Sequence, residues 1–233
     1  MTRALILAVM LTGCAAHAEP AAADMPTYQE VHPPYGYMGF CIRNPLACEG
    51  GTDHPARIEL TPEAWGSLNA VNDYVNRLPQ VSDEALYGRP EWWAVAGSDG
   101  GDCEDLALAK QRLLIERGFP ASALLIAVAK QWNGDGHAVL IAATNKGDYV
   151  LDSMGWRVEH WRDTSYRWIK RQSAERPFIW INLDRSVARD IAVRSPPLGE
   201  PAPFLAALHK NMPDDVAALE NCAELARIDG RVC

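Results

Sequence analysis

Hydrophobic residues recur at the spacing of an α-helix in the segment that follows Thr61. Thr61 is a favourable N-cap and Pro62 a favourable first helical residue, while Pro79 ends the pattern. The apolar positions between them are Trp65, Leu68, Val71, Val75 and Leu78. The pattern predicts an amphipathic helix with these side chains on its buried face.

A second helix is predicted to start directly after Asp102. Asp102 is the expected N-cap, Asp105 imitates the acidic residue of a capping box, and Gly118 and Pro120 end the helix. One face of this helix carries Leu106, Ala109 and Leu113. Cys103 therefore falls in its first turn.

Short apolar runs between turn residues predict the strands. Residues 123–129 and 137–143 are almost wholly apolar, as in strands that are buried on both faces. Residues 145–148 predict a turn, and 149–151 lead back out of it. Three further strands are expected at 157–161, 166–171 and 178–182. A helix packed against an antiparallel sheet is an α+β arrangement.

The composition divides the chain into four parts. Hydrophobic residues make up 48% and charged residues 22% of the 233 residues, as in a globular protein. We expect a leader (1–18), a Pro- and Gly-rich extended segment (19–60), the core (61–183) and a C-terminal extension (184–233) with a helix at 214–228. The net charge of −8 argues against a surface that binds nucleic acid or anionic membranes.

The leader has the pattern of an export signal. Arg3 gives a short positive region, residues 4–11 form an apolar run, and residues 16–18 form a small-residue cleavage site. Residues 11–14 also resemble a lipobox, which would make Cys14 the acylated first residue of a lipoprotein. We therefore expect a periplasmic or secreted protein. The choice between a soluble protein and one with a lipid anchor stays open.

Export makes the cysteines informative, because disulfides persist in oxidising compartments. Cys41 and Cys48 flank a turn-like stretch, and Cys222 and Cys233 close a short loop near the C-terminus. Each pair is a candidate disulfide, and this pairing leaves Cys103 unpaired. The chain has no Cys-x-x-Cys motif, which disfavours a structural zinc site.

An unpaired cysteine at a helix start has the placement of a nucleophile. The unsatisfied N–H groups and the positive end of the helix dipole favour a thiolate. Gly100 and Gly101 allow a tight turn before Cys103 and leave room for a substrate. A buried, inert thiol is the competing interpretation.

His137 begins one predicted strand and Asp152 follows the next. Both are equidistant from a turn centre between residues 144 and 145, so an antiparallel hairpin would place them opposite one another. Asp152 would then orient the imidazole through Nδ1 and leave Nε2 for the thiol. Taken separately, a surface histidine and a solvated strand end are simpler interpretations. Their common register favours a triad of Cys103, His137 and Asp152.

Three acids lie within two residues of the proposed nucleophile: Asp102, Glu104 and Asp105. Like charges raise the pKa of a thiol unless a cation neutralises them, and hard oxygen ligands of this kind suit calcium. The alternative is that Asp102 and Asp105 cap the helix while Glu104 is solvated. The residues alone leave both interpretations open.

An acyl-transfer site also needs donors for an oxyanion. The backbone N–H of Cys103 is one expected donor, because it begins the helix. Trp92 and Trp93 stand on the loop that runs into Gly101, and an indole N–H of either residue is a candidate for the second donor.

The blocks around these residues resemble a known family. Gly-Asp-Cys-Glu-Asp at 101–105, Gly-His-Ala-Val-Leu at 136–140 and Val-Leu-Asp-Ser at 150–153 are similar to the bacterial transglutaminase-like cysteine proteinases, the family of LapG-type periplasmic proteases. The resemblance covers about residues 35–183, and the order Cys, His, Asp is the order of the family. The chain departs from the LapG branch in its Cys41 and Cys48, in its Cys-containing tail, and in Ser153 where asparagine is usual.

The resemblance implies a papain-like, transglutaminase-core fold with the triad Cys103, His137 and Asp152. It implies a calcium ion near the nucleophile, with Asp102, Glu104 and Asp105 as ligands. It also implies a protein substrate, namely an outer-membrane adhesin that is cut near its N-terminus, and an inner-membrane receptor that senses cyclic di-GMP.

The prediction is therefore an exported cysteine endopeptidase that works through an acyl-enzyme. Two other interpretations stay open. The same triad serves a transglutaminase or amidase if an amine accepts the acyl group, and a catalytically silent module would only bind a peptide in the cleft. Since no member of the triad is replaced, the silent module ranks last.

Overall fold

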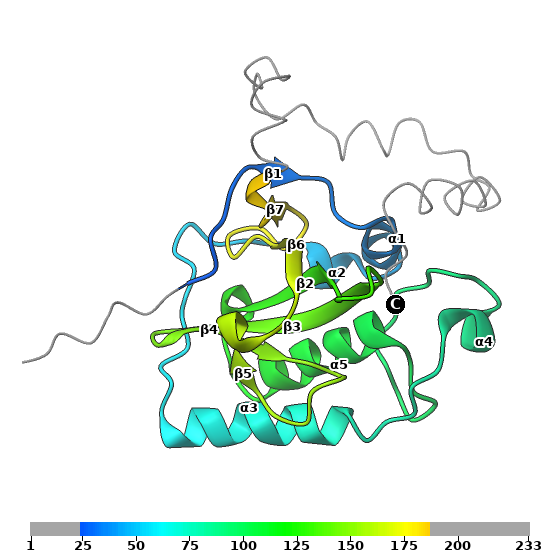
Figure 1. The fold of residues 1–233 in the computed structure, drawn as a ribbon, viewed down its shortest axis with the longest axis horizontal. Helices are drawn as coiled ribbons and strands as arrows, with labels where there is room; N and C mark the ends of the chain where they lie inside the picture. The colour runs from blue at the N-terminus through cyan, green and yellow to red at the C-terminus, as the bar shows by residue number, and fades with distance from the viewer. Residues whose placement is uncertain (1–23, 187–233) are drawn as a thin grey trace, which may run out of the picture.

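The computed structural model describes residues 24–186, which form an antiparallel sheet with helices packed on one face (Figure 1). The seven strands lie in the order β1-β7-β6-β2-β3-β4-β5, and every neighbouring pair is antiparallel. In that order their bounds are Glu30–Val31, Trp180–Asn182, Arg167–Gln172, Leu124–Lys130, Gly136–Thr144, Gly147–Leu151 and Glu159–His160. The predicted α+β class is confirmed.

The apolar runs predicted as buried strands become β2 and β3 at the centre of the sheet. Because side chains alternate between the two faces of a strand, Leu124 and Ile126 join the core under the helices. Leu125 and Ala127 belong to a second cluster on the other face, together with Trp168. Both faces of the sheet are thus covered at β2 and β3, which explains why these strands lack polar residues at alternate positions.

Helix α3 spans Pro62–Val75 and starts as predicted, since the Thr61 side chain accepts a hydrogen bond from the N–H of Ala64 at 3.2 Å. Its buried face is formed by Leu68, Val71 and Val75. Trp65, expected on that face, is partly exposed and packs edge-on against Tyr149 instead.

Helix α5 spans Cys103–Glu116 and packs against α3, β2 and β3, so it lies between the outer helix and the sheet (Figure 1). Asp102 is its N-cap residue but makes no side-chain capping bond. Asp105 does not complete a capping box either, because its carboxylate accepts from the N–H of Ala94 at 2.6 Å. The loop that contains Ala94 is therefore hydrogen-bonded to Asp105, the third residue of the helix.

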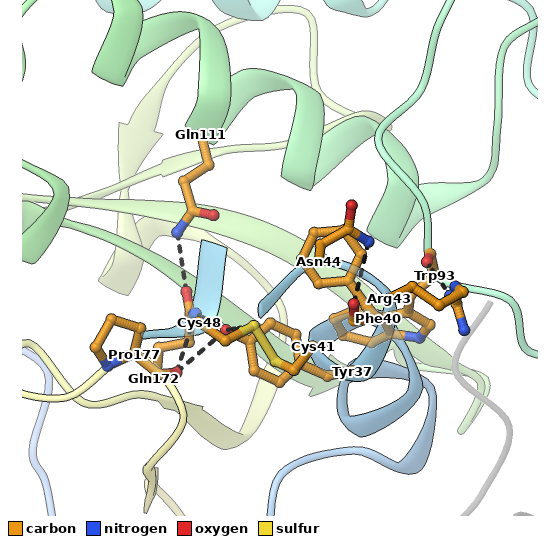
Figure 2. Close-up of a disulfide and its surroundings, with 10 residues drawn as sticks. All are labelled: Tyr37, Phe40, Cys41, Arg43, Asn44, Cys48, Trp93, Gln111, Gln172 and Pro177. Atoms are coloured by element: carbon orange, nitrogen blue, oxygen red, sulfur yellow. Dashed lines mark hydrogen bonds between the residues drawn. A yellow bond between two sulfur atoms is a disulfide. The ribbon is translucent and has the colours of Figure 1, made fainter. Parts of the chain in front are cut away.

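Residues 24–60 are not simply extended. They contain α1 (Tyr35–Arg43) and α2 (Pro45–Cys48), and β1 adds an edge strand to the sheet. The predicted disulfide between Cys41 and Cys48 links the two helices (Figure 2). The Tyr37 hydroxyl lies 3.5 Å from the Cys48 sulfur and accepts from Gln172 at 2.7 Å. This segment is part of the core, not a separate lead-in.

Smaller elements complete the described part. The predicted loop over 80–101 contains a short helix, α4 (Asp83–Tyr87), and η1 (Ala121–Ala123) precedes β2. The strand expected at 157–161 is reduced to β5 and followed by η2 (Trp161–Asp163). Among residues 24–186, no helix has the length and apolarity that crossing a membrane requires. The leader, the helix at 214–228 and the pair Cys222 and Cys233 lie outside the described residues.

Candidate active site

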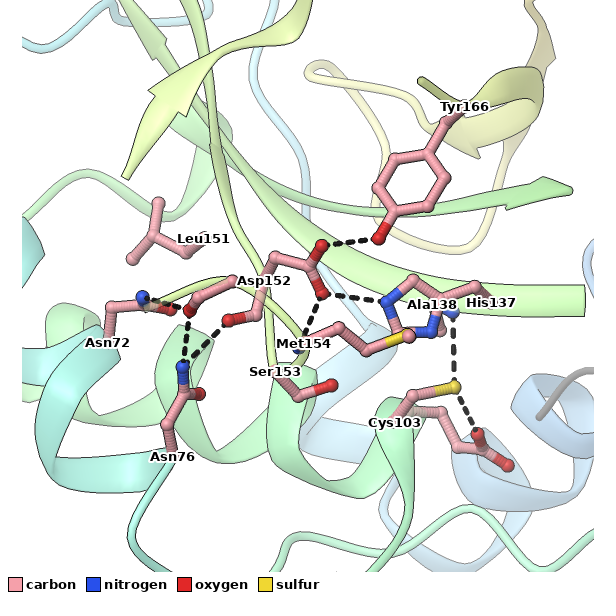
Figure 3. A network of polar contacts seen from close by, with 12 residues as sticks. Asn72, Asn76, Cys103, His137, Ala138, Leu151, Asp152, Ser153, Met154 and Tyr166 are labelled. Atoms are coloured by element: carbon pink, nitrogen blue, oxygen red, sulfur yellow. Dashed lines mark hydrogen bonds and ion pairs between the residues drawn. The ribbon is translucent and has the colours of Figure 1, made fainter. Parts of the chain in front are cut away.

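Cys103 is the first residue of α5, and its side chain is buried. The backbone N–H of Ala138, the third residue of β3, donates a hydrogen bond to Cys103 Sγ at 3.1 Å (Figure 3). The helix terminus and this N–H both place partial positive charge beside the sulfur. Both therefore favour a thiolate over a thiol.

The glycines before Cys103 serve the chain itself. Gly100 has a φ of +87°, and a Cβ atom there would lie 1.9 Å from the carbonyl oxygen of Pro79. A Cβ atom on Gly101 would lie 2.5 Å from the Cβ atom of Asp105. The turn into α5 thus depends on glycine because neighbouring segments pack directly against it.

The Cys103 sulfur is disulfide-bonded in this structure, whereas the sequence led us to expect an unpaired cysteine. Its partner is neither Cys41 nor Cys48, because these two bond to one another. A sulfur held in a disulfide is not a nucleophile. The structure therefore represents the oxidised form of the site, and chemistry at Cys103 requires its reduction.

His137 and Asp152 form a buried pair next to Cys103. The Nε2 atom of His137 lies 2.7 Å from Oδ1 of Asp152, and only 2% and 6% of the two residues is exposed. Burial by itself would raise the pKa of Asp152, but the hydrogen bonds and charge of His137 and the Tyr166 hydroxyl outweigh burial and lower it. Asp152 is therefore held as a carboxylate.

The hairpin that carries these residues differs from the expected one by one position. Thr144 pairs with Gly147 and Leu140 with Leu151, so the turn centre lies one residue later than predicted. Asp152 follows the end of β4 and lies diagonally across from His137, not directly opposite. Diagonal neighbours remain within reach of long side chains, so the contact forms in spite of the shift.

The imidazole is also turned the other way. We expected Asp152 to bind Nδ1, but it binds Nε2. Figure 3 shows the second ring nitrogen on the side of the ring that faces Cys103. In this structure Nδ1, rather than Nε2, is the ring nitrogen on the side of the sulfur.

Three groups that sequence reasoning missed hold Asp152 in place. Tyr166 donates its hydroxyl to Oδ2 at 2.5 Å, and the N–H of Met154 donates to Oδ1 at 2.9 Å. Asn76, the C-cap residue of α3, donates to the backbone carbonyl of Asp152 at 2.8 Å. Of these, Tyr166 has a sequence signal, because it stands two positions before Trp168 in the strand predicted at 166–171, and the two side chains pack together in the structure.

An acidic cluster stands on the other side of Cys103. Carboxylate oxygens of Asp83, Asp102 and Glu104 all lie within 4.8 Å of one another. The expected set contained Asp105 in place of Asp83. Asp83 comes from α4, twenty positions before Cys103, so nothing in the local pattern around the cysteine points to it.

The cluster has the chemistry of a cation site. Three of its buried carboxylate oxygens have no hydrogen-bond partner in the described part of the chain, one each on Asp83, Asp102 and Glu104. Burial raises the pKa of all three acids, to about 6 for Asp102 and well above the usual value for Glu104. A divalent cation would replace the lost hydration of these oxygens. The residues present therefore fit calcium.

Glu104 also connects the cluster to the sulfur, since its Oε2 atom lies 3.3 Å from Cys103 Sγ. An ionised Glu104 would oppose a thiolate at that distance. Neutralisation of the cluster, by protons or by a cation, therefore favours ionisation of Cys103.

The two tryptophans proposed as oxyanion donors are engaged elsewhere. Trp93 is wholly buried against Tyr37 and Trp180, so its indole N–H cannot meet a substrate. The ring of Trp92 stacks under the guanidinium of Arg43 at 3.5 Å, and its backbone N–H donates to Asp83. Trp92 thus contacts Arg43 of α1 and Asp83 of the acidic cluster, and Trp93 packs against Tyr37 of α1.

The chain matches one protein family and several solved structures. The family model described as bacterial transglutaminase-like cysteine proteinase matches residues 27–188. No curated protein matches the chain. Among solved structures, Legionella pneumophila LapG in an EGTA-treated form is 24% identical with a TM-score of 0.45, over 55% of this chain and 71% of LapG. The calcium-bound form of Legionella pneumophila LapG is 21% identical with a TM-score of 0.44, over 66% and 83%. The family assignment rests on the sequence match.

Proposed function

The chain belongs to the family of bacterial transglutaminase-like cysteine proteinases, and we propose that Cys103 is its nucleophile, His137 its general base and Asp152 the acid that orients the histidine. One arrangement carries the proposal. The Cys103 sulfur accepts a hydrogen bond from Ala138 at 3.1 Å, and the residue before Ala138 is the histidine paired with Asp152 at 2.7 Å.

The proposed reaction is peptide hydrolysis through an acyl-enzyme. A thiol donor first reduces the Cys103 disulfide by two electrons, because the oxidised sulfur cannot attack. His137 then takes the thiol proton through Nδ1, and the thiolate forms a C–S bond with the scissile carbonyl carbon. The carbonyl oxygen becomes an oxyanion, which the N–H at the start of α5 stabilises.

Collapse of this intermediate completes the first half of the reaction. The peptide C–N bond breaks, and the imidazolium of His137 gives its proton to the leaving amine. Water then loses a proton to His137 and attacks the thioester. The C–S bond breaks and the imidazolium of His137 returns its proton to the sulfur, which gives a carboxylic acid and the regenerated thiol of Cys103.

We include calcium in the proposal as the cation held by Asp83, Asp102 and Glu104. When bound, it supplies positive charge to a buried, acid-rich position beside the nucleophile. The partnerless oxygens and raised pKa values of these acids support the assignment. Asp105, which the sequence suggested as a ligand, is not part of the cluster.

The setting proposed for this activity is outside the cytoplasm. The signal-like residues 1–18, with Cys14 as a candidate lipid anchor, support export to the periplasm or beyond it. The substrate is a polypeptide, which we propose to be an outer-membrane adhesin under the control of an inner-membrane receptor for cyclic di-GMP.

A comparison of secreted and surface proteins between a deletion strain and the wild type tests this proposal. A surface protein that stays full-length without the enzyme, and is cut again by the wild-type gene but not by Cys103→Ala, is the expected result. Mass spectrometry of the purified reaction distinguishes the chemistry. New free termini support hydrolysis, whereas isopeptide cross-links to an amine would overturn it in favour of transglutamination.

A further inference from the structure

Tyr166 touches both members of the buried His137–Asp152 pair. Its hydroxyl donates to Asp152 Oδ2 at 2.5 Å, and its ring lies 5.4 Å from the imidazole of His137 (Figure 3). Trp168 packs edge-on against the ring of Tyr166 at 5.7 Å, which restricts the movement of the tyrosine. The tyrosine directly precedes β6, which lies two strands away from β3, so its position is set by the sheet.

From this geometry we infer that Tyr166 is a positioning residue for the proposed reaction, acting on the nucleophile through Asp152 and His137. The two carboxylate oxygens have separate donors, because His137 and the N–H of Met154 occupy Oδ1 while Tyr166 occupies Oδ2. With both oxygens held, the carboxylate cannot turn about its Cβ–Cγ bond. The imidazole is then fixed with Nε2 toward Asp152 and Nδ1 toward Cys103.

The surroundings of Tyr166 keep its hydroxyl protonated, so it remains a hydrogen-bond donor to Asp152. Burial, the hydrogen bond to Asp152 and the nearby charges of Asp152 and Glu159 all raise the pKa of its hydroxyl. The hydroxyl therefore retains its proton throughout the neutral range. It does not exchange protons with the substrate, which separates its role from that of His137.

The inference rests on the proposed function, so the test uses measurements that need no substrate. The full-length protein is reduced with dithiothreitol and freed of it, and the rate of Cys103 alkylation by iodoacetamide is followed at pH 7 by peptide mass spectrometry. Tyr166→Phe keeps the ring and removes the donor. We expect alkylation to slow by about tenfold, the size expected for loss of one hydrogen bond to a charged group.

The matched control is Tyr149→Phe. The ring of Tyr149 packs against Trp65 of α3 and His160 of β5 rather than against His137. Its alkylation rate should equal that of the wild type. In an Asp152→Asn background, Tyr166→Phe should cause no further slowing, because the tyrosine acts through the carboxylate. An additional loss in that background would overturn the inference.

A spectroscopic measurement separates positioning from loss of structure. In protein labelled with ¹⁵N-histidine, we expect the proton of His137 on Nε2, and Tyr166→Phe should broaden or move that signal while the other histidines stay unchanged. If Tyr166→Phe leaves both the signal and the alkylation rate unchanged while His137→Ala slows alkylation, the role of Tyr166 is overturned and that of His137 stands. Unchanged alkylation in His137→Ala would instead reject the proposed base.

Discussion

The backbone N–H of Ala138 donates to the Sγ atom of Cys103 at 3.1 Å, so the sheet contacts the start of α5 at the residue that follows His137. This contact is made by the main chain, and it fixes the spacing between the sulfur and the histidine without any additional side chain. The donor is present whatever residue occupies position 138, except proline. The site is thus assembled by the packing of α5 on β3.

Cys103→Ala is expected to abolish proteolysis while the fold stays intact. Removal of the nucleophile should lower turnover by about a thousandfold or more, because no other group can form the thioester. The measurement is cleavage of the polypeptide found in the deletion strain, together with the circular dichroism spectrum. Cleavage at the wild-type rate would exclude Cys103 as the nucleophile.

The double variant Cys41→Ala/Cys48→Ala is the matched control for that experiment. It removes the disulfide between α1 and α2, which lies away from the proposed triad. We expect the free energy of unfolding to fall by about 2 kcal/mol, since a short closed loop is opened. Proteolysis at low temperature should persist.

Reduction should activate the protein. Because Cys103 is disulfide-bonded in this structure, protein kept under oxidising conditions should neither react with iodoacetamide at Cys103 nor cleave its substrate. Incubation with dithiothreitol should restore both, and peptide mapping distinguishes Cys103 from Cys41 and Cys48. Rapid labelling of Cys103 in the oxidised protein would contradict this expectation.

Calcium should bind through Asp83. We expect Asp83→Asn to weaken calcium binding by at least about tenfold, measured by isothermal titration calorimetry. A chelator should lower the activity of the wild type, and calcium should restore it. Asp73→Asn is the control. Asp73 lies on α3, outside the acidic cluster, and forms an exposed ion pair with Arg77. Full activity in the presence of chelator would leave the cluster without a catalytic role.

The buried Lys110 should make stability depend on pH. Burial lowers its pKa to about 7, and its Nζ atom lies 3.5 Å from the carbonyl oxygen of Leu151. The unfolded chain binds a proton at this lysine up to about pH 10.4, so folding releases a proton above pH 7. The stability of the wild type should therefore rise with pH between these two values.

Lys110→Met isolates this contribution. The variant removes the buried amine, so its free energy of unfolding at pH 7 should exceed that of the wild type by about 1–3 kcal/mol. The difference should shrink as pH rises, when urea unfolding is compared from pH 7 to 10. A difference that does not change with pH would show that Lys110 is protonated in the folded protein.

The sequence by itself determined the local features of the site. A cap at Thr61, apolar spacing and glycine-rich turns fixed the two helices, and continuous apolar runs fixed the central strands. These features depend on the conformation of neighbouring residues, which local composition encodes. The start of α5 at Cys103 and the strand that begins beside His137 follow from such patterns.

Only the tertiary structure decided which distant groups meet there. The hairpin is shifted by one residue, Asp152 contacts Nε2 of His137, and the loop at 80–101 brings Asp83 to Asp102 and Glu104. The sheet brought Tyr166 to Asp152, and Cys103 is disulfide-bonded rather than unpaired. Each of these contacts links different elements or loops of the fold. Their geometry is set by the packing of whole elements, which periodicity does not specify.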